Sequence, residues 1–470
     1  MQKDCNWTTC HADRVAVIID AAKFFYTAKL AMLEARHSIL LIGWDFDARI
    51  QLEPEKQTLP GPNRIGKFLN WVADQKPQLD VRILKWDVGI LRSVVQGETP
   101  LFLLRWMMGG RVTLKLDAAH PPLSTHHMKL LVIDGALAFC GGIDMISGRW
   151  DTREHDQDRR GRRTPHGEPQ GPWHDATMCV AGPIARKLTE LGMARWRKAC
   201  GEELKIIARS DFPWPKDLAV DFENIDVSIA RTMPAYEETE QISEIEAATL
   251  EILRQARRFV YIESQYFASS RIADVIVQRL AEPDGPDFVV INPDTADGWL
   301  ESKAMDSARI CLMHRLRKAD KHDRFRIFYP VNAAGTPIYV HAKILIADDT
   351  VLKVGSANLN NRSMGFDTEC DLIIRAENAD TSARIARIRN GLLAEHLGKS
   401  TEEVAAACGS DLAEGRLIPG ITALNKDGRQ LVPLPMRELT EAEKALAGSS
   451  VVDPERPASV WTQVRGRLHR

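Results

Sequence analysis

The feature that most constrains the fold is an eight-residue pattern that occurs twice in the 470-residue chain. Residues 127–134 and residues 341–348 both read H-x-K-x4-D. After six further residues each copy is followed by a glycine and a small residue, at 141–142 and at 355–356. One H-x-K is weak evidence in a chain with 13 histidines, but two extended copies at matching spacing indicate an internal duplication.

The apolar residues at the centre of each motif predict a short buried strand. Residues two apart on a strand point to the same face, so His127 and Lys129 would point together, as would His341 and Lys343. An imidazole and an ammonium group from each copy could therefore meet at one anion.

The motif aspartates, Asp134 and Asp348, follow the histidines by seven residues, which is an odd number. On a regular strand they would face away from the histidines. We therefore expect them to brace the end of the strand rather than to touch a substrate.

The same order of predicted elements precedes both motifs. The first half has helices at 14–35, 64–75 and 88–109, with strands at 38–44, 81–86 and 112–116. The second half has helices at 239–257, 271–281 and 300–319, with strands at 259–262, 288–291 and 324–328. We predict an α/β protein of two similar lobes related by a pseudo-twofold axis, each a mixed β-sheet flanked by helices, with the active site at the lobe interface.

The predicted domains follow this duplication. They are an N-terminal lobe at 1–207, an inter-lobe connection at 208–232, a C-terminal lobe at 233–400 and a tail at 401–470 packed on the body. Residues 151–172 are rich in charged residues and proline, which is typical of a solvated loop. The alternative for this loop is a flap over the mouth of the cleft or a contact with a headgroup.

Composition limits the partners and the compartment. The net charge of −2 offers no general attraction to nucleic acid, so we expect no nucleic-acid partner. Eight scattered cysteines without a CxxC pair predict free thiols in a reducing compartment. No signal peptide or transmembrane anchor is predicted. We expect a cytoplasmic monomer that binds membranes transiently at their surface, with export by a signal-independent route as an alternative.

Further segments extend each motif: residues 141–144, 148–151 and 172–175 in the first half, and 261–267 and 355–363 in the second. With them the sequence resembles the phospholipase D superfamily, whose mark is two H-x-K-x4-D motifs each followed by G-(G/S)-x-(N/D), and in particular its phospholipase D branch. The likeness spans residues 14 to 400.

The resemblance implies a phosphodiesterase that works through a phosphohistidine intermediate. By its pattern His127 is the nucleophile and His341 the general acid and base, although the two motifs alone are symmetric on this point. Lys129, Lys343 and Asn358 match the positions that hold the phosphate and offset its charge. No metal or other cofactor is expected, because the two lysines supply the positive charge.

The resemblance also places acidic residues behind the histidines. Glu369 is the match in the second half, and Asp151 is the preferred match in the first. Asp144 stands where many members of the superfamily carry Asn. A carboxylate there should not bind phosphate, so we expect Asp144 to orient a neighbouring residue.

Other histidines have structural interpretations. His126 would point away from the face of His127, which favours a structural role. His120 and His174 could line the cleft, although packing behind it is preferred for His174. A metal site made from His120, His127, Asp134 and His174 is disfavoured, because no pair of these residues has a usual zinc spacing.

The predicted function is that of a phospholipase D, which hydrolyses the distal phosphodiester bond of glycerophospholipids at a membrane surface to phosphatidic acid and free headgroup. An alcohol in place of water would give transphosphatidylation. A phosphatidyltransferase of the cardiolipin synthase type is one alternative, disfavoured by the lack of N-terminal membrane helices. A nuclease or other phosphodiesterase is disfavoured by the slight acidity, and a lipid sensor with a dead site by the two intact motifs.

Overall fold

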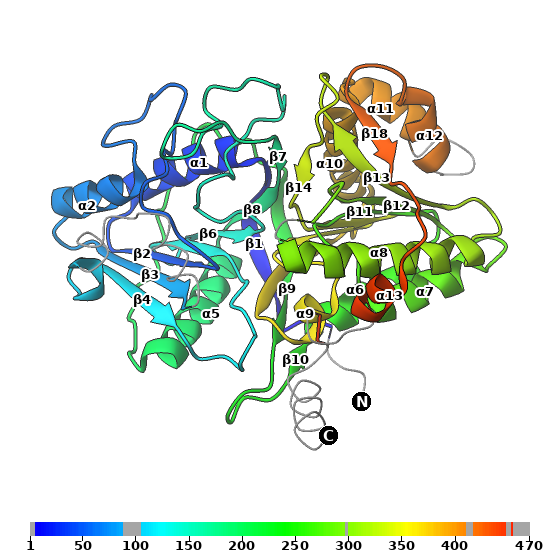
Figure 1. Ribbon diagram of the computed structural model, residues 1–470. Helices are drawn as coiled ribbons and strands as arrows, with labels where there is room; N and C mark the ends of the chain where they lie inside the picture. Colours follow the sequence, from blue (N-terminus) through cyan, green and yellow to red (C-terminus); the bar gives the residue numbers. More distant parts are fainter. Residues whose placement is uncertain (1–4, 88–104, 297–298, 410–416, 448–452, 455–470) are drawn as a thin grey trace. The chain divides into compact units, whose positions relative to one another are not determined.

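The computed structural model describes residues 5–87, 105–296, 299–409, 417–447 and 453–454. The chain forms two compact units (Figure 1). The first-motif unit consists of residues 8–120 and 125–228, and the second-motif unit consists of residues 1–7, 121–124 and 229–470.

The sheet of the first-motif unit is mixed. In sheet order its strands are β1 (Thr8–Ile19), β8 (Ala176–Ala181), β6 (Leu137–Gly141), β5 (Leu130–Ile133), β2 (Ser38–Gly43), β3 (Asp80–Trp86) and β4 (Val112–Asp117). β2, β3 and β4 are parallel, whereas β5 pairs antiparallel with β2 and the remaining neighbours alternate in direction. The motif strand β5 is therefore central.

The second-motif unit repeats this arrangement. In sheet order its strands are β18 (Gln430–Pro433), β13 (Phe325–Val331), β12 (Asp287–Ile291), β11 (Phe259–Glu263), β15 (Ile344–Ala347), β16 (Val351–Gly355) and β17 (Glu369–Arg375). β11, β12 and β13 are parallel, and β15 pairs antiparallel with β11, as β5 does with β2. The predicted duplication of an α/β unit is confirmed.

Four further strands are short or lie near the boundary. They are β7 (Trp173–His174), β9 (Phe222–Met233), β10 (Ile242–Ser243) and β14 (Tyr339–Val340). The end of β9 pairs antiparallel with β10. β9 crosses the boundary between the two units, which falls after residue 228, inside the stretch predicted to connect the lobes.

Helices cover both faces of the first sheet (Figure 1). They are α1 (Ala21–Glu34), α2 (Ile65–Gln75) and α5 (Pro183–Cys200). Ile39 on β2 joins a buried cluster with Phe24 of α1 and Phe68 of α2. On the opposite face α5 comes so close that a Cβ on Gly192 would lie 2.8 Å from the side chain of Leu40. Burial on both faces explains why β2 is a continuous apolar run.

The second-motif unit has more helices. They are α6 (Glu244–Gln255), α7 (Ser270–Leu280), α8 (Trp299–Ala319), α9 (Asn361–Gly365), α10 (Ala379–Leu397), α11 (Thr401–Cys408), α12 (Leu417–Leu424) and α13 (Glu441–Ala447). Leu253 of α6 and Leu316 of α8 pack in one cluster with Ile262 of β11. α10 reaches the same strand through His396, whose Nε2 lies 2.9 Å from Glu263.

The tail at 401–470 contributes helices and a strand to the second-motif unit, as far as it is described. β18 pairs antiparallel with β13, and Leu431 on it is fully buried. All eight cysteines are free thiols. Among the described residues no helix is long and apolar enough to cross a membrane.

The helix predicted at 14–35 is partly wrong, because its first residues belong to strand β1 and α1 begins only at Ala21. Val15, Val17 and Ile18 are β-branched, and β1 pairs with β8, which lies far away in the sequence. Asp20, at φ 64°, separates the strand from the helix. Most of the helix predicted at 88–109 lies outside the described residues.

The loop at 151–172 is only partly solvated. Asp151, His155 and Arg162 are each at most 3% exposed. Arg162 donates to both Asp151 oxygens at 3.0 Å and to the carbonyl of Gln170 at 3.0 Å. The buried ion pair between Arg162 and Asp151 therefore fixes part of the loop at 151–172, whose composition predicted solvent exposure.

Candidate active site in two halves

The first half-site lies where the chain enters β5. Lys129 is 4% exposed, and its Nζ donates to the carbonyl oxygen of His127 at 2.7 Å. The same ammonium group lies 3.1 Å from Asp144 Oδ2. Asp144 Oδ1 accepts a hydrogen bond from the backbone N–H of Trp44 at 3.1 Å. Asp144 thus holds Lys129 in place, as expected for a carboxylate that orients a neighbour.

The second half-site has the same backbone plan but different charges. His341 is 5% and Lys343 2% exposed, and Lys343 Nζ donates to the carbonyl oxygen of His341. Lys343 Nζ and Asn358 Nδ2 each lie 3.5 Å from Gln265 Oε1. In sequence, Asn358 follows His341 by 17 residues, as Asp144 follows His127, so an amide stands at the motif position of the carboxylate.

Gln265 was not predicted as a site residue. Its Nε2 donates to the hydroxyl groups of Tyr266 and Tyr339, at 3.1 and 3.0 Å, which fixes its carbonyl oxygen toward Lys343 and Asn358. The available signal was its position two residues after strand β11, at the edge of the sheet where the motif histidine stands.

Asp134 closes the far end of the first motif strand. It accepts backbone N–H groups of three consecutive residues, Arg36, His37 and Ser38, each at 2.8 Å. These are the residues that lead into β2. The carboxylate ties the end of β5 to the start of its neighbour, as predicted for a bracing residue.

Asp348 makes the equivalent contacts in the second-motif unit. It accepts the backbone N–H groups of Arg257, Arg258 and Phe259 at 2.7 to 2.9 Å. Its φ is 55° and that of Asp134 is 48°, so both residues start a left-handed turn that Asp tolerates.

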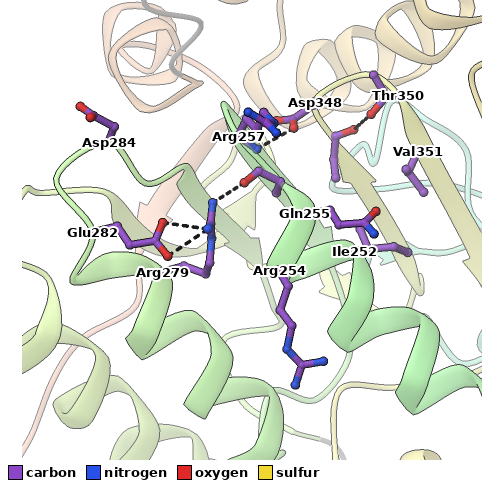
Figure 2. Close-up of a pocket in the computed structure, with 12 residues that line it drawn as sticks. Ile252, Arg254, Gln255, Arg257, Arg279, Glu282, Asp284, Asp348, Thr350 and Val351 are labelled. Carbon is purple, nitrogen blue, oxygen red and sulfur yellow. Dashed lines mark hydrogen bonds and ion pairs between the residues drawn. The ribbon is translucent and has the colours of Figure 1, made fainter. Parts of the chain in front are cut away.

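A cavity of about 850 Å³ lies beside Asp348 (Figure 2). Arg257 and Arg279 line it, and Arg279 pairs with Glu282 at 2.7 Å. Asp348 ends the motif strand that His341 begins, so this cavity lies at the opposite end of β15 from the histidine. It does not form part of the half-site.

Glu369 stands directly before Cys370, whose carbonyl oxygen accepts the N–H of Ser356 at 3.1 Å. Its carboxylate accepts the hydroxyl groups of Ser356 and Ser363, the latter at 2.7 Å. Two hydroxyl donors therefore fix the carboxylate that the resemblance places behind a histidine.

Sheet register identifies the equivalent residue in the first half. The N–H of Gly142 donates to the carbonyl oxygen of Ala176 at 2.8 Å, just as Ser356 does to Cys370. Asp175 precedes Ala176 as Glu369 precedes Cys370, and it is fully buried. Asp175 is the positional counterpart of Glu369.

The sequence-based prediction names Asp151 for this role, so the first half has two candidates. In the described part of the chain its carboxylate contacts His155 at 2.9 Å, Arg162 at 3.0 Å and the N–H groups of Thr152 and Trp173 at 2.9 Å. None of these contacts is to His127. Its charge and its closeness to the first motif in the sequence favour Asp151. The pairing of β6 with β8, which the sequence does not reveal, favours Asp175 instead.

His126 belongs to a buried ionic cluster. Its Nε2 lies 2.7 Å from Arg195 and 3.1 Å from Asp117. Burial lowers the pKa of His126 to about 4, against the opposing effect of Asp117. Although burial alone would raise the pKa of Asp117, its hydrogen bonds with His126 and Arg195 hold it well below the ordinary range. These contacts agree with a structural role for His126.

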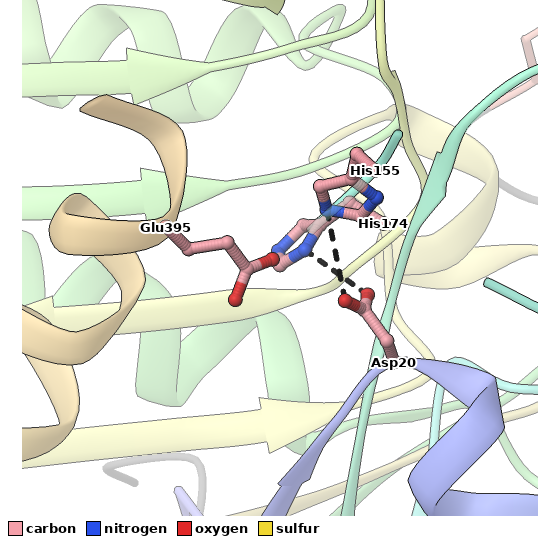
Figure 3. Close-up of side chains that lie close together, drawn as sticks. All are labelled: Asp20, His155, His174 and Glu395. Carbon is pink, nitrogen blue, oxygen red and sulfur yellow. Dashed lines mark ion pairs between the residues drawn. The ribbon is translucent and has the colours of Figure 1, made fainter. Parts of the chain in front are cut away.

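His174 and His120 have different surroundings. His174 is fully buried, and its Nδ1 lies 3.2 Å from Asp20, beside His155 (Figure 3). Ligand atoms of Asp20, His155 and His174 lie within 4.8 Å of one another, so these residues could hold a metal ion. His120, which is less buried, accepts the indole N–H of Trp86 at 3.1 Å.

Comparison with known proteins matches the parts of the chain that carry the two motifs. Residues 109–275 match the family described as phospholipase D, and residues 249–390 match the family described as cardiolipin synthase, PLD-like domain. Phospholipase D alpha 4 of Arabidopsis thaliana is 22% identical over 482 residues, with 78% of this chain and 62% of that protein covered. Phospholipase D1 of Schizosaccharomyces pombe is 24% identical, with 82% and 35% covered.

This chain thus spans less than two thirds of the length of these curated relatives. Among solved structures, phosphatidylserine synthase of Haemophilus influenzae Rd KW20 matches with a TM-score of 0.58 at 12% identity, covering 81% of this chain and 86% of that one. That likeness concerns the fold. Two motif-bearing units of one topology, matched by both family descriptions, establish that the chain belongs to the phospholipase D superfamily.

Proposed function

We propose that this protein is a phospholipase D that cleaves the distal phosphodiester bond of glycerophospholipids at a membrane surface. The observation that supports this most is the repeated geometry of the half-sites. In each, a buried lysine is bonded to the backbone of its own motif histidine, and an aspartate at the far end braces the strand. The proposal requires the two histidines to act on one phosphorus atom.

The proposed reaction has two steps. His127 attacks phosphorus, and the bond to the headgroup oxygen breaks as His341 donates a proton to that oxygen. His341 then takes a proton from water, whose oxygen displaces His127 and releases phosphatidic acid. Lys129, Lys343 and Asn358 would hold the non-bridging oxygens in both steps.

The charges of the half-sites suit a phosphodiester. Lys129 and Asp144 together carry no net charge, whereas Lys343 lies beside the neutral amides of Asn358 and Gln265. These five side chains therefore offer one positive charge to a substrate phosphate with one negative charge. Because the site is buried, that attraction is stronger than it would be in water.

A phosphatidyltransferase is the second candidate. It is favoured by the match of residues 249–390 to the family described as cardiolipin synthase, PLD-like domain. The covalent intermediate would be the same, and an alcohol would replace water as the acceptor. An assay without any added alcohol separates the two candidates, because a hydrolase forms phosphatidic acid with water as the only acceptor, whereas a transferase turns over only when an alcohol is added.

The proposed enzyme would approach the bilayer from water as a cytoplasmic, peripherally bound monomer. Release of choline from phosphatidylcholine vesicles tests the main proposal. His127→Ala and His341→Ala should each abolish release, whereas His322→Ala, at an exposed histidine of the second-motif unit, should leave it unchanged. Release that survives both motif substitutions would overturn the proposal.

A further inference from the structure

A small cavity of the first-motif unit, with a volume of about 290 Å³, is lined by arginines. It is lined by Phe25 of α1, by Arg64 and by residues from three loop segments, within 49–54, 146–150 and 160–167. Its described lining includes no Asp or Glu. The arginines, here called the arginine cavity, are Arg49, Arg64, Arg160 and Arg163.

The positive charge of this cavity is mostly uncompensated. Arg49 is paired with Asp47, through two contacts of 2.9 Å. Arg163 donates to the carbonyl oxygen of Gly167 at 2.9 Å, which is a neutral partner. In the part of the chain that the structure describes, Arg64 and Arg160 form no ion pair.

Two carboxylates close to this loop are engaged by an arginine outside the cavity. Arg159, which does not line the cavity, lies 2.9 Å from Glu55 and 2.9 Å from Asp156. This leaves Arg160 for another anion. Three guanidinium groups without a carboxylate partner around one small cavity repel one another, so a bound anion would stabilise the arrangement.

The walls of the cavity are fixed by packing. A Cβ on Gly161 would lie 2.3 Å from the ring of Trp150, which also lines the cavity. Gly148 has φ +84°, and a Cβ there would lie 2.5 Å from Gln170 Oε1. Arg162 holds the same loop in place through its buried ion pair with Asp151. The backbone segments that carry the arginines are therefore fixed by packing.

We propose that the arginine cavity binds a phosphate dianion, either inorganic phosphate or the phosphomonoester group of a lipid. Guanidinium groups match tetrahedral phosphate oxygens through paired hydrogen bonds. The volume of about 290 Å³ is at the small end for ligand pockets, which suits a headgroup phosphate rather than a whole lipid. A phosphomonoester there would hold the protein on a bilayer despite its net charge of −2.

This inference concerns binding and does not depend on the proposed hydrolysis. The test compares the full-length protein with an Arg64→Gln/Arg160→Gln variant by equilibrium dialysis against labelled inorganic phosphate. Both arginines are exposed, so the variant should fold. The control is Arg186→Gln, at an exposed arginine on α5 outside the cavity. Phosphate that binds at any other site should be bound equally by the parent protein, the double variant and the control.

The double variant should lose one bound phosphate per chain or bind it at least about tenfold more weakly, whereas the control should match the parent protein. Equal binding in all three proteins would overturn the inference. Flotation with vesicles then separates the two sources. Preference for phosphatidic acid over phosphatidylglycerol at equal charge, lost in the double variant, identifies a lipid phosphomonoester; phosphate binding without that preference identifies the free anion.

Choline release from neutral vesicles by the double variant keeps the two proposals apart. An unchanged rate together with lost phosphate binding supports the arginine cavity and leaves the catalytic proposal intact.

Discussion

Asp144 Oδ2 lies 3.1 Å from Lys129 Nζ, and both side chains are buried in the first-motif unit. In the second-motif unit an amide, Asn358, stands at the motif position of the carboxylate. Both motifs carry the histidine and the lysine, but Lys129 lies beside a carboxylate, whereas Lys343 lies 3.5 Å from the amide oxygen of Gln265.

Replacing this carboxylate should destabilise the protein. Asp144→Asn keeps an acceptor for Trp44 but leaves the Lys129 ammonium buried without its counter-charge, so the free energy of unfolding should fall by about 3 kcal/mol. Urea denaturation measures the change. Asp427→Asn, at an exposed aspartate, is the control and should have no effect. Equal stability of the two variants would contradict the role given to the ion pair.

Asp348 should stabilise the fold through its hydrogen bonds with three backbone N–H groups. Asp348→Ala would leave three consecutive N–H groups without their acceptor, and each such loss costs about 1 kcal/mol or more. The unfolding free energy should therefore fall by about 3 kcal/mol or more, and Asp134→Ala should behave alike in the other unit. Thermal denaturation that is unaffected in both variants would argue against bracing.

Substitutions at Asp151, which the sequence favours as the support of His127, and at Asp175, which sheet register favours, should have different effects. Asp151→Asn should mainly lower stability, because it breaks the buried pair with Arg162. Asp175→Asn should mainly lower kcat and change its pH profile, since Asp175 is the counterpart of Glu369. The comparison needs kcat, KM and melting temperature for both variants. A reversed pattern would restore Asp151 as the residue that supports a histidine.

Much of the fold could be predicted from the sequence, because local patterns determine it. The motif strands, the repeated order of elements and the inward apolar runs follow from short-range periodicity. β1 was misread because its partner β8 lies far along the chain and its apolar residues also fit a helical stripe. Asp175, Gln265 and the arginine cavity depend on which loops meet in space, and the sequence pattern carries no such information.

Acid should weaken the first-motif unit through His126. Its pKa in the folded protein is about 4, below the ordinary value of 6.5, so the folded state disfavours the protonated ring. The stabilisation is fully present above pH 6.5 and is lost as the pH falls toward 4, by up to about 3 kcal/mol. Urea denaturation of the parent and of His126→Asn across this range tests it, and the variant should show a smaller decline. Parallel curves would contradict the prediction.

The central claim is that the histidines of both motifs close on one phosphorus atom. A crystal structure with vanadate, which imitates the five-coordinate phosphorus of phosphoryl transfer, tests it most directly. The account predicts one vanadate bonded to Nε2 of His127, with His341 on its opposite side and Lys129 and Lys343 on its oxygens. Two vanadates in separate clefts, or one that His341 cannot reach, would contradict it.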